Sequence, residues 1–473
     1  MRHEELPEWS QKAADWAAQY HATLRDRPVR SQLAPGEILN QIYPSPPNLP
    51  EDFESIFDDF KRIIPDGITH WQHPRFFAYF SSNAAPASML AEQLANAISA
   101  QCMLWQTSPA ATELETAMMD WLRQAFDLSP AFRGVIHDTA TTATLCAVLT
   151  MREKALKWRG LEEGLANHPT LRIYASNQTH SSIDKAVRLA GIGQNNLVKI
   201  PTNEHWAMCP DALAKAIQAD RSSGFLPAGV IACIGGTSIG ASDDLGSTLT
   251  IAKAEGLYSH VDAAWAGSAM ICSEFRSVWQ GIEETDSLVI NPHKWLGANF
   301  DCSVQFLRNP VDQLQTLSMR PDYLETLEEE AITNYSDWTI PLGRRFRALK
   351  IWFLLRAYGL EGLRSRIRNH VAWTQQACET ISTIPGIEIT TEPKFALFTF
   401  RLVTGDRDPN EATRELLQRI NADGRIYLTQ TTHEDQFVIR FTIGQLDTQW
   451  EDVKVGIEVI RELTHDIIGS DLP

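Results

Sequence analysis

The chain has 473 residues, of which 44% are hydrophobic and 21% are charged; this excludes a largely disordered protein and predicts two or three domains. Its formal net charge of −17 argues against a nucleic-acid partner, because phosphate binding needs clustered Lys and Arg. Seven scattered cysteines without a CxxC pair argue against a disulfide framework or a zinc site, so no metal is expected and a reducing, cytoplasmic location is predicted. No apolar run approaches the ~20 residues of a membrane helix, so no membrane contact is expected.

The first segment, residues 1–84, is predicted to be helical. One apolar stripe recurs at helical spacing: Trp9, Ala13, Trp16, Ala17 and Tyr20. A proline-rich linker over 43–50 separates this stripe from a second predicted helix over 52–64. A small helical segment needs a surface on which to bury such a stripe, and we expect a partner subunit to provide it.

Residues 85–365 and 366–473 differ in pattern and are predicted to form two further domains. In the first, short apolar strands alternate with helical stretches, which predicts an α/β domain with a mostly parallel sheet and helices on both faces. Its expected strands are 171–175, 230–234, 258–261 and 287–290. In the second, the expected elements are strands 387–391, 397–402 and 437–441 and helices 410–422 and 450–467. This pattern predicts a smaller α+β domain.

Two charged residues directly follow predicted strands of the larger domain. Asp262 ends the strand at 258–261 and is followed by small residues, and Lys294 follows a proline turn and a histidine after the strand at 287–290. Ligands of open parallel sheets bind beyond the carboxyl ends of the strands. A pyridoxal 5'-phosphate (PLP) site needs a lysine for the Schiff base and a carboxylate that keeps the pyridine nitrogen protonated. The pair therefore predicts a PLP site; the alternatives are a helix cap for Asp262 and an exposed charge for Lys294.

Four stretches of the sequence resemble one known family. They are residues 105–115 (WQTSPAATELE), 260–267 (HVDAAWAG), 291–296 (NPHKWL) and 338–347 (WTIPLGRRFR). In order and approximate spacing they are similar to the group II PLP decarboxylases, specifically the aromatic-L-amino-acid decarboxylase family, and the similarity runs from about residue 49 to 460. The resemblance implies a fold-type-I PLP enzyme and an intertwined homodimer with shared active sites.

The resemblance also assigns residues to the cofactor. His180 matches the histidine that stacks on the PLP ring, Ala264 the small residue under the opposite ring face, and Thr237 a threonine near the ring oxygen. Ala140 and Thr141 match the phosphate contacts at a helix N-terminus, with Asn291 and His293 contributing from their loop. This sequence departs from the family pattern at Asp138, which would repel a phosphate if it pointed inward, and at Trp265, where tyrosine is usual.

Tyr335 is the residue that distinguishes between reaction types. It lies in the stretch 320–339, which contains the acidic run Glu328–Glu330 and resembles the family's mobile catalytic loop. Decarboxylation leaves a carbanion at Cα, and a tyrosine on a closing loop can deliver the proton while excluding water. Family members with phenylalanine at this position tend to be aldehyde synthases, so Tyr335 favours plain decarboxylation. The alternative is an ordinary surface tyrosine.

Substrate contacts follow from the resemblance alone. The matched positions are Trp71, Tyr79, Phe80, Ser82, Met103, Leu104, Phe300 and Arg440, with Met103 and Leu104 contributed across the dimer interface. An aromatic cluster without that resemblance is more often core than pocket, and Arg440 could be a structural arginine.

The function implied is PLP-dependent decarboxylation of an aromatic L-amino acid, with Lys294, Asp262, His180 and Tyr335 as catalytic residues. An aromatic aldehyde synthase is the first alternative, and a catalytically dead PLP-fold binding protein is the second. The accepted side chain stays open among tryptophan, tyrosine, phenylalanine, dihydroxyphenylalanine and histidine.

Overall fold

The computed structural model describes residues 1–319, 332–405 and 407–470. Contacts divide the chain into two units, residues 1–81 with 372–473 and residues 82–371. The division into 1–84, 85–365 and 366–473 stays a prediction. Among the described residues, no helix combines the length and the apolar character needed to cross a lipid bilayer.

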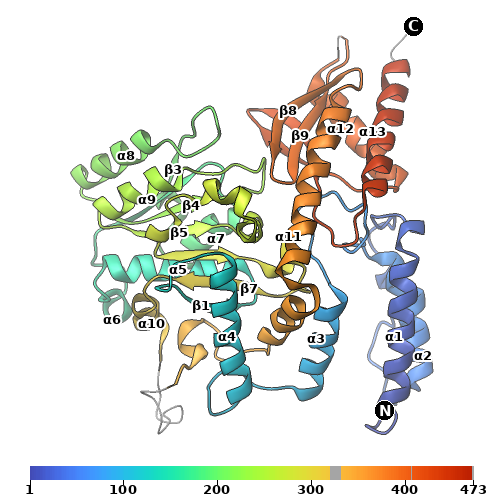
Figure 1. The fold of residues 1–473 in the computed structure, drawn as a ribbon, viewed down its shortest axis with the longest axis horizontal. Coiled ribbons are helices and arrows are strands. Elements are labelled where there is room, and N and C mark those ends of the chain that lie inside the picture. Colours follow the sequence, from blue (N-terminus) through green and yellow to red (C-terminus); the bar gives the residue numbers. More distant parts are fainter. Residues whose placement is uncertain (320–331, 406, 471–473) are drawn as a thin grey trace. The chain divides into compact units, whose positions relative to one another are not determined.

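The unit formed by residues 82–371 is built around a seven-stranded sheet (Figure 1). Its strands are β1 (Arg133–His137), β2 (Leu171–Ser176), β3 (Leu197–Ile200), β4 (Leu226–Cys233), β5 (Tyr258–Asp262), β6 (Ser287–Ile290) and β7 (Ser303–Leu307), in the spatial order β1-β7-β6-β5-β4-β2-β3. Strands β2 to β6 pair in parallel, whereas β7 is antiparallel to both its neighbours. The predicted mostly parallel α/β sheet is confirmed; β1, β3 and β7 were not among the expected strands.

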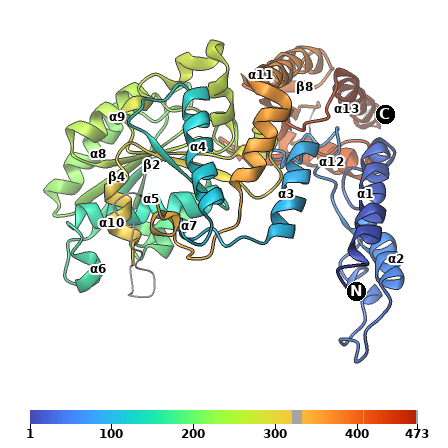
Figure 2. The same cartoon turned by 60° about the horizontal axis from the view of Figure 1, so that its bottom comes forward.

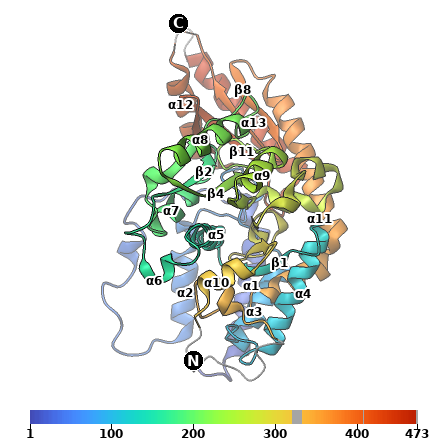
Figure 3. The same ribbon diagram turned by 90° about the vertical axis from the view of Figure 1, so that its left-hand side faces the viewer.

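Helices cover both faces of this sheet, because alternate side chains of each strand point to opposite faces. On one face, α5 (Ala140–Ala155) and α7 (Ser181–Leu189) pack against Ile173, Ala175 and Ile231. On the other, α8 (Pro210–Ser222) and α9 (Leu245–Ala254) share a core with Tyr174 and Val230. Figures 2 and 3 show the two helix layers and, between them, the strands.

Five further α-helices among the described residues belong wholly or mostly to this unit. They are α3 (Pro86–Ile98), α4 (Pro109–Ala125), α6 (Gly160–Glu163), α10 (Val311–Leu317) and most of α11 (Ala348–Ile381), which is interrupted at Gly359 and continues into the other unit. Helix α4 packs beside the edge strand β1, and α10 packs on α5.

The other unit contains a four-stranded antiparallel sheet in the order β10-β11-β9-β8. Its elements are β8 (Ile387–Lys394), β9 (Leu397–Leu402), β10 (Thr429–His433), β11 (Gln436–Thr442), α12 (Pro409–Asp423), α13 (Trp450–Ser470), α1 (Leu6–Ala22) and α2 (Phe53–Ile63). Helices α12 and α13 and the strands share one apolar core, which also takes in Phe77. The predicted small C-terminal α+β fold is therefore confirmed; its sheet is antiparallel, and β10 is an additional strand.

Helices α1 and α2 lie side by side (Figure 1), and the predicted aromatic stripe is the surface that joins them. The Trp9 ring contacts Phe53 edge-on with centroids 4.7 Å apart, and Trp16 contacts Phe60 at the same separation. The stripe thus finds part of its packing surface within this chain.

Candidate active site

The turns that follow the parallel strands meet at one edge of the large sheet. Because β1 is antiparallel to β7, and β7 to β6, β1 runs in the same direction as β2 to β6. Its carboxyl end, and the start of α5 after it, therefore lie at the same edge as the ends of β2, β4, β5 and β6. The residues that the sequence assigned to the cofactor all occupy these turns.

Lys294 lies in the short helical turn Pro292–Leu296, directly after β6. Its backbone N–H donates to the Asn291 carbonyl at 2.9 Å. Its own carbonyl accepts from the side-chain amide of Asn83 at 2.7 Å, and the Asn83 backbone N–H donates to His293. The backbone at the lysine is therefore held by the chain before α3 as well as by its own turn.

Asp262 ends β5 and is buried. It pairs in register with Cys233 of β4 and Val289 of β6, so it sits between the two neighbouring strand ends. Its Oδ1 accepts from the Ala264 N–H at 3.1 Å, and the Ala264 carbonyl accepts from the Asn291 N–H at 2.9 Å. Two hydrogen bonds thus connect the turn of Asp262 to the turn of Lys294.

His180 is the N-cap of α7, after β2. Its Nδ1 lies 2.9 Å from the Ser182 hydroxyl and accepts from the Ser182 N–H at 3.1 Å, in partly buried surroundings. Desolvation lowers the pKa of His180, Asp262 opposes this and Lys294 adds to it. Asp262 and Lys294 therefore lie near enough to act on His180 electrostatically, and the capping bond fixes the orientation of its imidazole.

The start of α5 has the features of an anion site. Its N-cap, Thr139, makes no side-chain capping bond, so the first N–H groups of a sixteen-residue helix are left for a ligand. Ala140 and Thr141 are its first two residues. The carboxylate of Asp138 accepts from the Thr139 N–H at 2.6 Å; this bond leaves its negative charge in place, so Asp138 remains a departure from the family pattern at this end of α5.

Asn291 and His293 are fixed by the residues that begin β7. The Ser303 hydroxyl donates to Asn291 Oδ1 at 2.7 Å, and the Cys302 N–H donates to His293 Nδ1 at 3.0 Å. Burial lowers the pKa of His293 to about 3, with Lys294 contributing further, so the ring is neutral at pH 7. Thr237 lies in the turn after β4 that the Gly240–Gly236 hydrogen bond closes.

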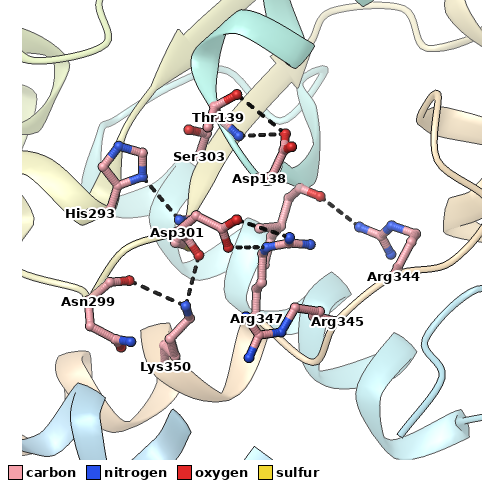
Figure 4. A network of polar contacts seen from close by, with 12 residues as sticks. Asp138, Thr139, His293, Asn299, Asp301, Ser303, Arg344, Arg345, Arg347 and Lys350 are labelled. Atoms are coloured by element: carbon pink, nitrogen blue, oxygen red, sulfur yellow. Dashed lines mark hydrogen bonds and ion pairs between the residues drawn. The ribbon is translucent and has the colours of Figure 1, made fainter. Parts of the chain in front are cut away.

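A charged network holds the segment before β7 (Figure 4). Arg347 donates to both carboxylate oxygens of Asp301, at 2.8 and 3.3 Å. The buried Lys350 donates to the carbonyls of Asn299 and Asp301 and pairs with Glu92 at 3.0 Å. The cations keep the pKa of Asp301 below its usual value against the effect of burial. This network fixes the chain just before Cys302, and through it His293.

Tyr335 is not in this group of residues. Its hydroxyl lies 2.9 Å from that of Thr116 in α4, and its ring packs with Val135, Leu307 and Trp338. Leu307 pairs with Arg133, the first residue of β1, so this contact lies on the side of the strands' amino ends. Burial and Glu115 raise the pKa of Tyr335. Residues 320–331 of its predicted loop, with Glu328–Glu330, lie outside the described residues.

The predicted substrate residues divide between the two units. In the first, Trp71 and Tyr79 stack with centroids 5.6 Å apart, and the Arg440 guanidinium stands 5.3 Å from the centre of the Phe80 ring. Arg440 also donates to the Thr429 hydroxyl and the Tyr79 carbonyl. In the second, Phe300 contacts the His293 ring edge-on, the Met103 carbonyl accepts from Ser336, and Ser82 precedes Asn83. Leu104 is buried.

Residues 35–403 match the family model of the pyridoxal-dependent decarboxylase conserved domain. The chain belongs to this decarboxylase family. It is a carboxy-lyase, and its cofactor is PLP.

Individual relatives cover almost the whole decarboxylase chain. Tryptophan decarboxylase 2 of Oryza sativa subsp. japonica is 37% identical over 99% of this chain and 96% of its own length. Phenylacetaldehyde synthase of Arabidopsis thaliana is 38% identical over 98% and 96%. A crystal structure of Oryza sativa TDC with PLP and tryptamine superposes with a TM-score of 0.95 at 33% identity, covering 99% of both chains. The family thus contains enzymes with different products.

The residues present in this decarboxylase fit PLP. The uncapped start of α5 offers N–H groups to a phosphate. The buried Asp262 carboxylate suits a pyridinium nitrogen. Lys294 offers an amine, and two hydrogen bonds connect its turn to the turn of Asp262. The structure brings together His180, Asp262, Ala264, Asn291, His293 and Lys294 as predicted neighbours at one sheet edge.

Three functional candidates of the decarboxylase were missed by sequence analysis. Asn83 bonds the Lys294 backbone, and His370 of α11 accepts from the Trp295 indole N–H. Tyr427 lies with its hydroxyl 3.5 Å from that of Tyr79, beside the predicted substrate aromatics. An asparagine in a loop and a histidine in a long helix carry no local signal, because only their distant partners give them a role.

Proposed function

We propose that this decarboxylase converts an aromatic L-amino acid to its amine and carbon dioxide. The observation that carries the proposal is the placement of Lys294, Asp262 and His180 after or at the ends of β6, β5 and β2, at the same sheet edge as the uncapped start of α5. Relatives named as tryptophan, tyrosine and aromatic-L-amino-acid decarboxylases support the aromatic substrate.

When bound, PLP supplies a conjugated ring that accepts the electron pair left as the carboxylate departs. Lys294 would hold the cofactor covalently through its amine. The Asp262 carboxylate would pair with the pyridine N–H and keep it protonated. His180 would hold the ring from one face, and burial lowers the pKa of this histidine. Ala140, Thr141, Asn291 and His293 would hold the phosphate end.

Tyr335 is proposed to deliver the proton to Cα, acting in the site of a second copy of the chain. In the chain described here its hydroxyl bonds Thr116, on the side of the amino ends of the strands, and its raised pKa at that position makes it a poor acid. The donor role therefore requires Tyr335 to leave Thr116. In a homodimer with shared sites, Tyr335 would enter the site of the second copy. The resemblance assigns Met103 and Leu104 to that same site, and the Met103 carbonyl accepts a hydrogen bond from the Ser336 N–H.

The seven scattered cysteines without a CxxC pair support a reducing, cytoplasmic setting. We assign no nucleic-acid or membrane partner.

The test is a product assay of the purified, PLP-saturated protein with tryptophan, tyrosine, phenylalanine, dihydroxyphenylalanine and histidine. We expect one amine per carbon dioxide for at least one aromatic substrate, with Lys294→Ala as the inactive control. Aldehyde, ammonia and hydrogen peroxide in place of the amine would identify an aldehyde synthase. No carbon dioxide from any of these substrates would overturn the proposal of an aromatic substrate.

A further inference from the structure

Trp265 and Trp295 form a flat stack behind the proposed site. Trp265 follows the turn of Asp262 and Ala264, and Trp295 is the residue directly after Lys294. Their ring centroids are 4.9 Å apart with an interplanar angle of 20°. Both side chains are fully buried. The stack therefore joins the turn that carries the carboxylate to the turn that carries the amine, at a second place beside the Ala264–Asn291 backbone bond.

Trp265 also reaches the turn after β4, which carries Thr237. Gly235 in that turn has a φ of +75°, and a Cβ added there would lie 3.1 Å from Trp265 Cε3 and 2.5 Å from Ala266 Cβ. The turn can approach the indole so closely only because residue 235 is glycine. Trp265, which lies after β5, thus packs against the turns that follow the two neighbouring strands, β4 and β6.

The Trp295 ring is fixed from the side of α11. Its indole N–H donates to His370 Nδ1 at 2.9 Å, and the His370 ring lies nearly parallel to it, at an angle of 10° with centroids 6.4 Å apart. Arg366, one helical turn before His370, donates to the carbonyls of Trp295 and Leu296 at 3.1 and 2.6 Å. Burial lowers the pKa of His370 to about 3, so it is a neutral acceptor at pH 7.

We infer that Trp265 is a positioning residue that sets Lys294 against Asp262, and that His370 completes the device by holding Trp295. An indole has a large flat face and one N–H group. Stacking of the Trp265 and Trp295 rings can therefore hold their two turns in a fixed relative position, and the hydrogen bond to His370 fixes the orientation of the Trp295 ring. Loss of the stack lets the lysine turn shift relative to the carboxylate. A shift of this kind reduces the rate of the chemical step more than substrate binding. The kinetic part of this inference rests on the proposed decarboxylation.

The test uses two matched pairs of variants in the PLP-saturated enzyme. Trp265→Phe keeps a flat ring, whereas Trp265→Leu keeps only apolar volume. His370→Asn keeps an acceptor near the position of Nδ1, whereas His370→Leu has none. Trp279→Leu, which removes an equally buried indole from the turn Ser273–Trp279, controls for loss of core packing. The readouts are kcat per bound cofactor, KM, the half-time of PLP release on dilution, and Tm.

We expect kcat per bound PLP to fall by about tenfold in both leucine variants with KM nearly unchanged, because a displaced reacting group slows chemistry rather than binding. PLP release should accelerate by at least threefold in the same variants, a readout that stands even if the substrate differs. Trp265→Phe and His370→Asn should recover most of both losses. Trp279→Leu should lower Tm without either effect. The inference is wrong if the leucine variants lower Tm as Trp279→Leu does yet keep normal kcat and normal release. If Trp265→Leu does not fold, the His370 pair decides.

Discussion

The Tyr335 hydroxyl lies 2.9 Å from the Thr116 hydroxyl, whereas Lys294 follows a strand at its carboxyl end. Tyr335 also lines a surface hollow with Pro130, Arg133 and Pro310, which flank the start of β1 and the end of β7. Within one chain, the proposed proton donor therefore lies near the amino ends of the parallel strands, and the proposed Schiff-base lysine lies at their carboxyl ends.

Tyr335→Phe should lower amine formation by on the order of 10²-fold or more, because phenylalanine keeps the ring but has no proton to donate. We expect part of the turnover to be diverted to oxidation by dissolved dioxygen, which yields aldehyde, ammonia and hydrogen peroxide. Thr116→Val removes the hydroxyl that Tyr335 contacts here and should leave amine formation intact. Amine and peroxide are measured in the same reaction. An unchanged amine yield in Tyr335→Phe would exclude it as the donor.

Lys294→Ala and Tyr335→Phe chains, each nearly inactive alone, should recover activity when unfolded and reassembled together. Random pairing of equal amounts makes half of the dimers mixed, and in each mixed dimer one site carries both substitutions and the other neither. About a quarter of all sites should then be intact, as two-fold assembly requires. Tagged pull-down verifies mixing. Activity that stays at the level of the separate variants despite mixing would show that each chain uses its own Tyr335.

Asp262→Asn should keep bound PLP but lower turnover by on the order of 10²-fold, the scale of one lost electrostatic contact. The amide preserves the bond from the Ala264 N–H but cannot carry the charge that keeps the pyridine nitrogen protonated. Lys294→Ala, by contrast, should abolish turnover and the visible absorbance of the covalently bound cofactor. Glu284→Gln, at an exposed ion pair with Lys253, is the control for loss of one carboxylate. Normal turnover in Asp262→Asn would contradict its role.

The unfolding free energy should decrease on acidification from pH 7 to 5, partly because of His260. Burial lowers the pKa of His260 from 6.5 to about 4, so the unfolded chain takes up the proton first and the folded state loses about 2 kcal/mol over this range. His260→Asn should make the dependence shallower, as measured by denaturant unfolding. Asp243 acts in the opposite sense, since burial raises its pKa to about 6. Asp243→Asn should therefore make the acid loss steeper. Equal slopes in all three proteins would contradict both assignments.

Glu115→Gln should destabilise the fold by about 3–5 kcal/mol, because it leaves the buried Arg344 without its charge partner. Arg344 donates to both Glu115 oxygens, at 3.1 and 2.6 Å, and both side chains are buried. The double variant Glu115→Gln with Arg344→Met should be more stable than Glu115→Gln alone. Breaking the exposed pair Lys253–Glu284 should change stability far less. Thermal and denaturant unfolding measure these differences.

The sequence by itself determined the fold class and the chemical type of the site. Short apolar runs located β2, β4, β5, β6, β8, β9 and β11, and the helical stripe located α1. Asp262 and Lys294 stand directly after strands, and parallel strands place their carboxyl ends at one edge, so their proximity followed from local pattern alone. The short strands β1, β3 and β7 were missed, because neither RGVIH nor SVQFL differs from other short apolar runs until its pairing is known.

Only the tertiary structure decided which distant groups support the site. Asn83 bonds a carbonyl 211 residues away, and His370 accepts from an indole 75 residues away. The chain also places Tyr335 against Thr116, 219 residues earlier. A local sequence determines residue type and strand or helix periodicity, but a contact over such separations depends on how the whole chain closes. The departure at Trp265 was visible in the sequence, and its stack on Trp295 became visible only when the turns after β5 and β6 were brought side by side.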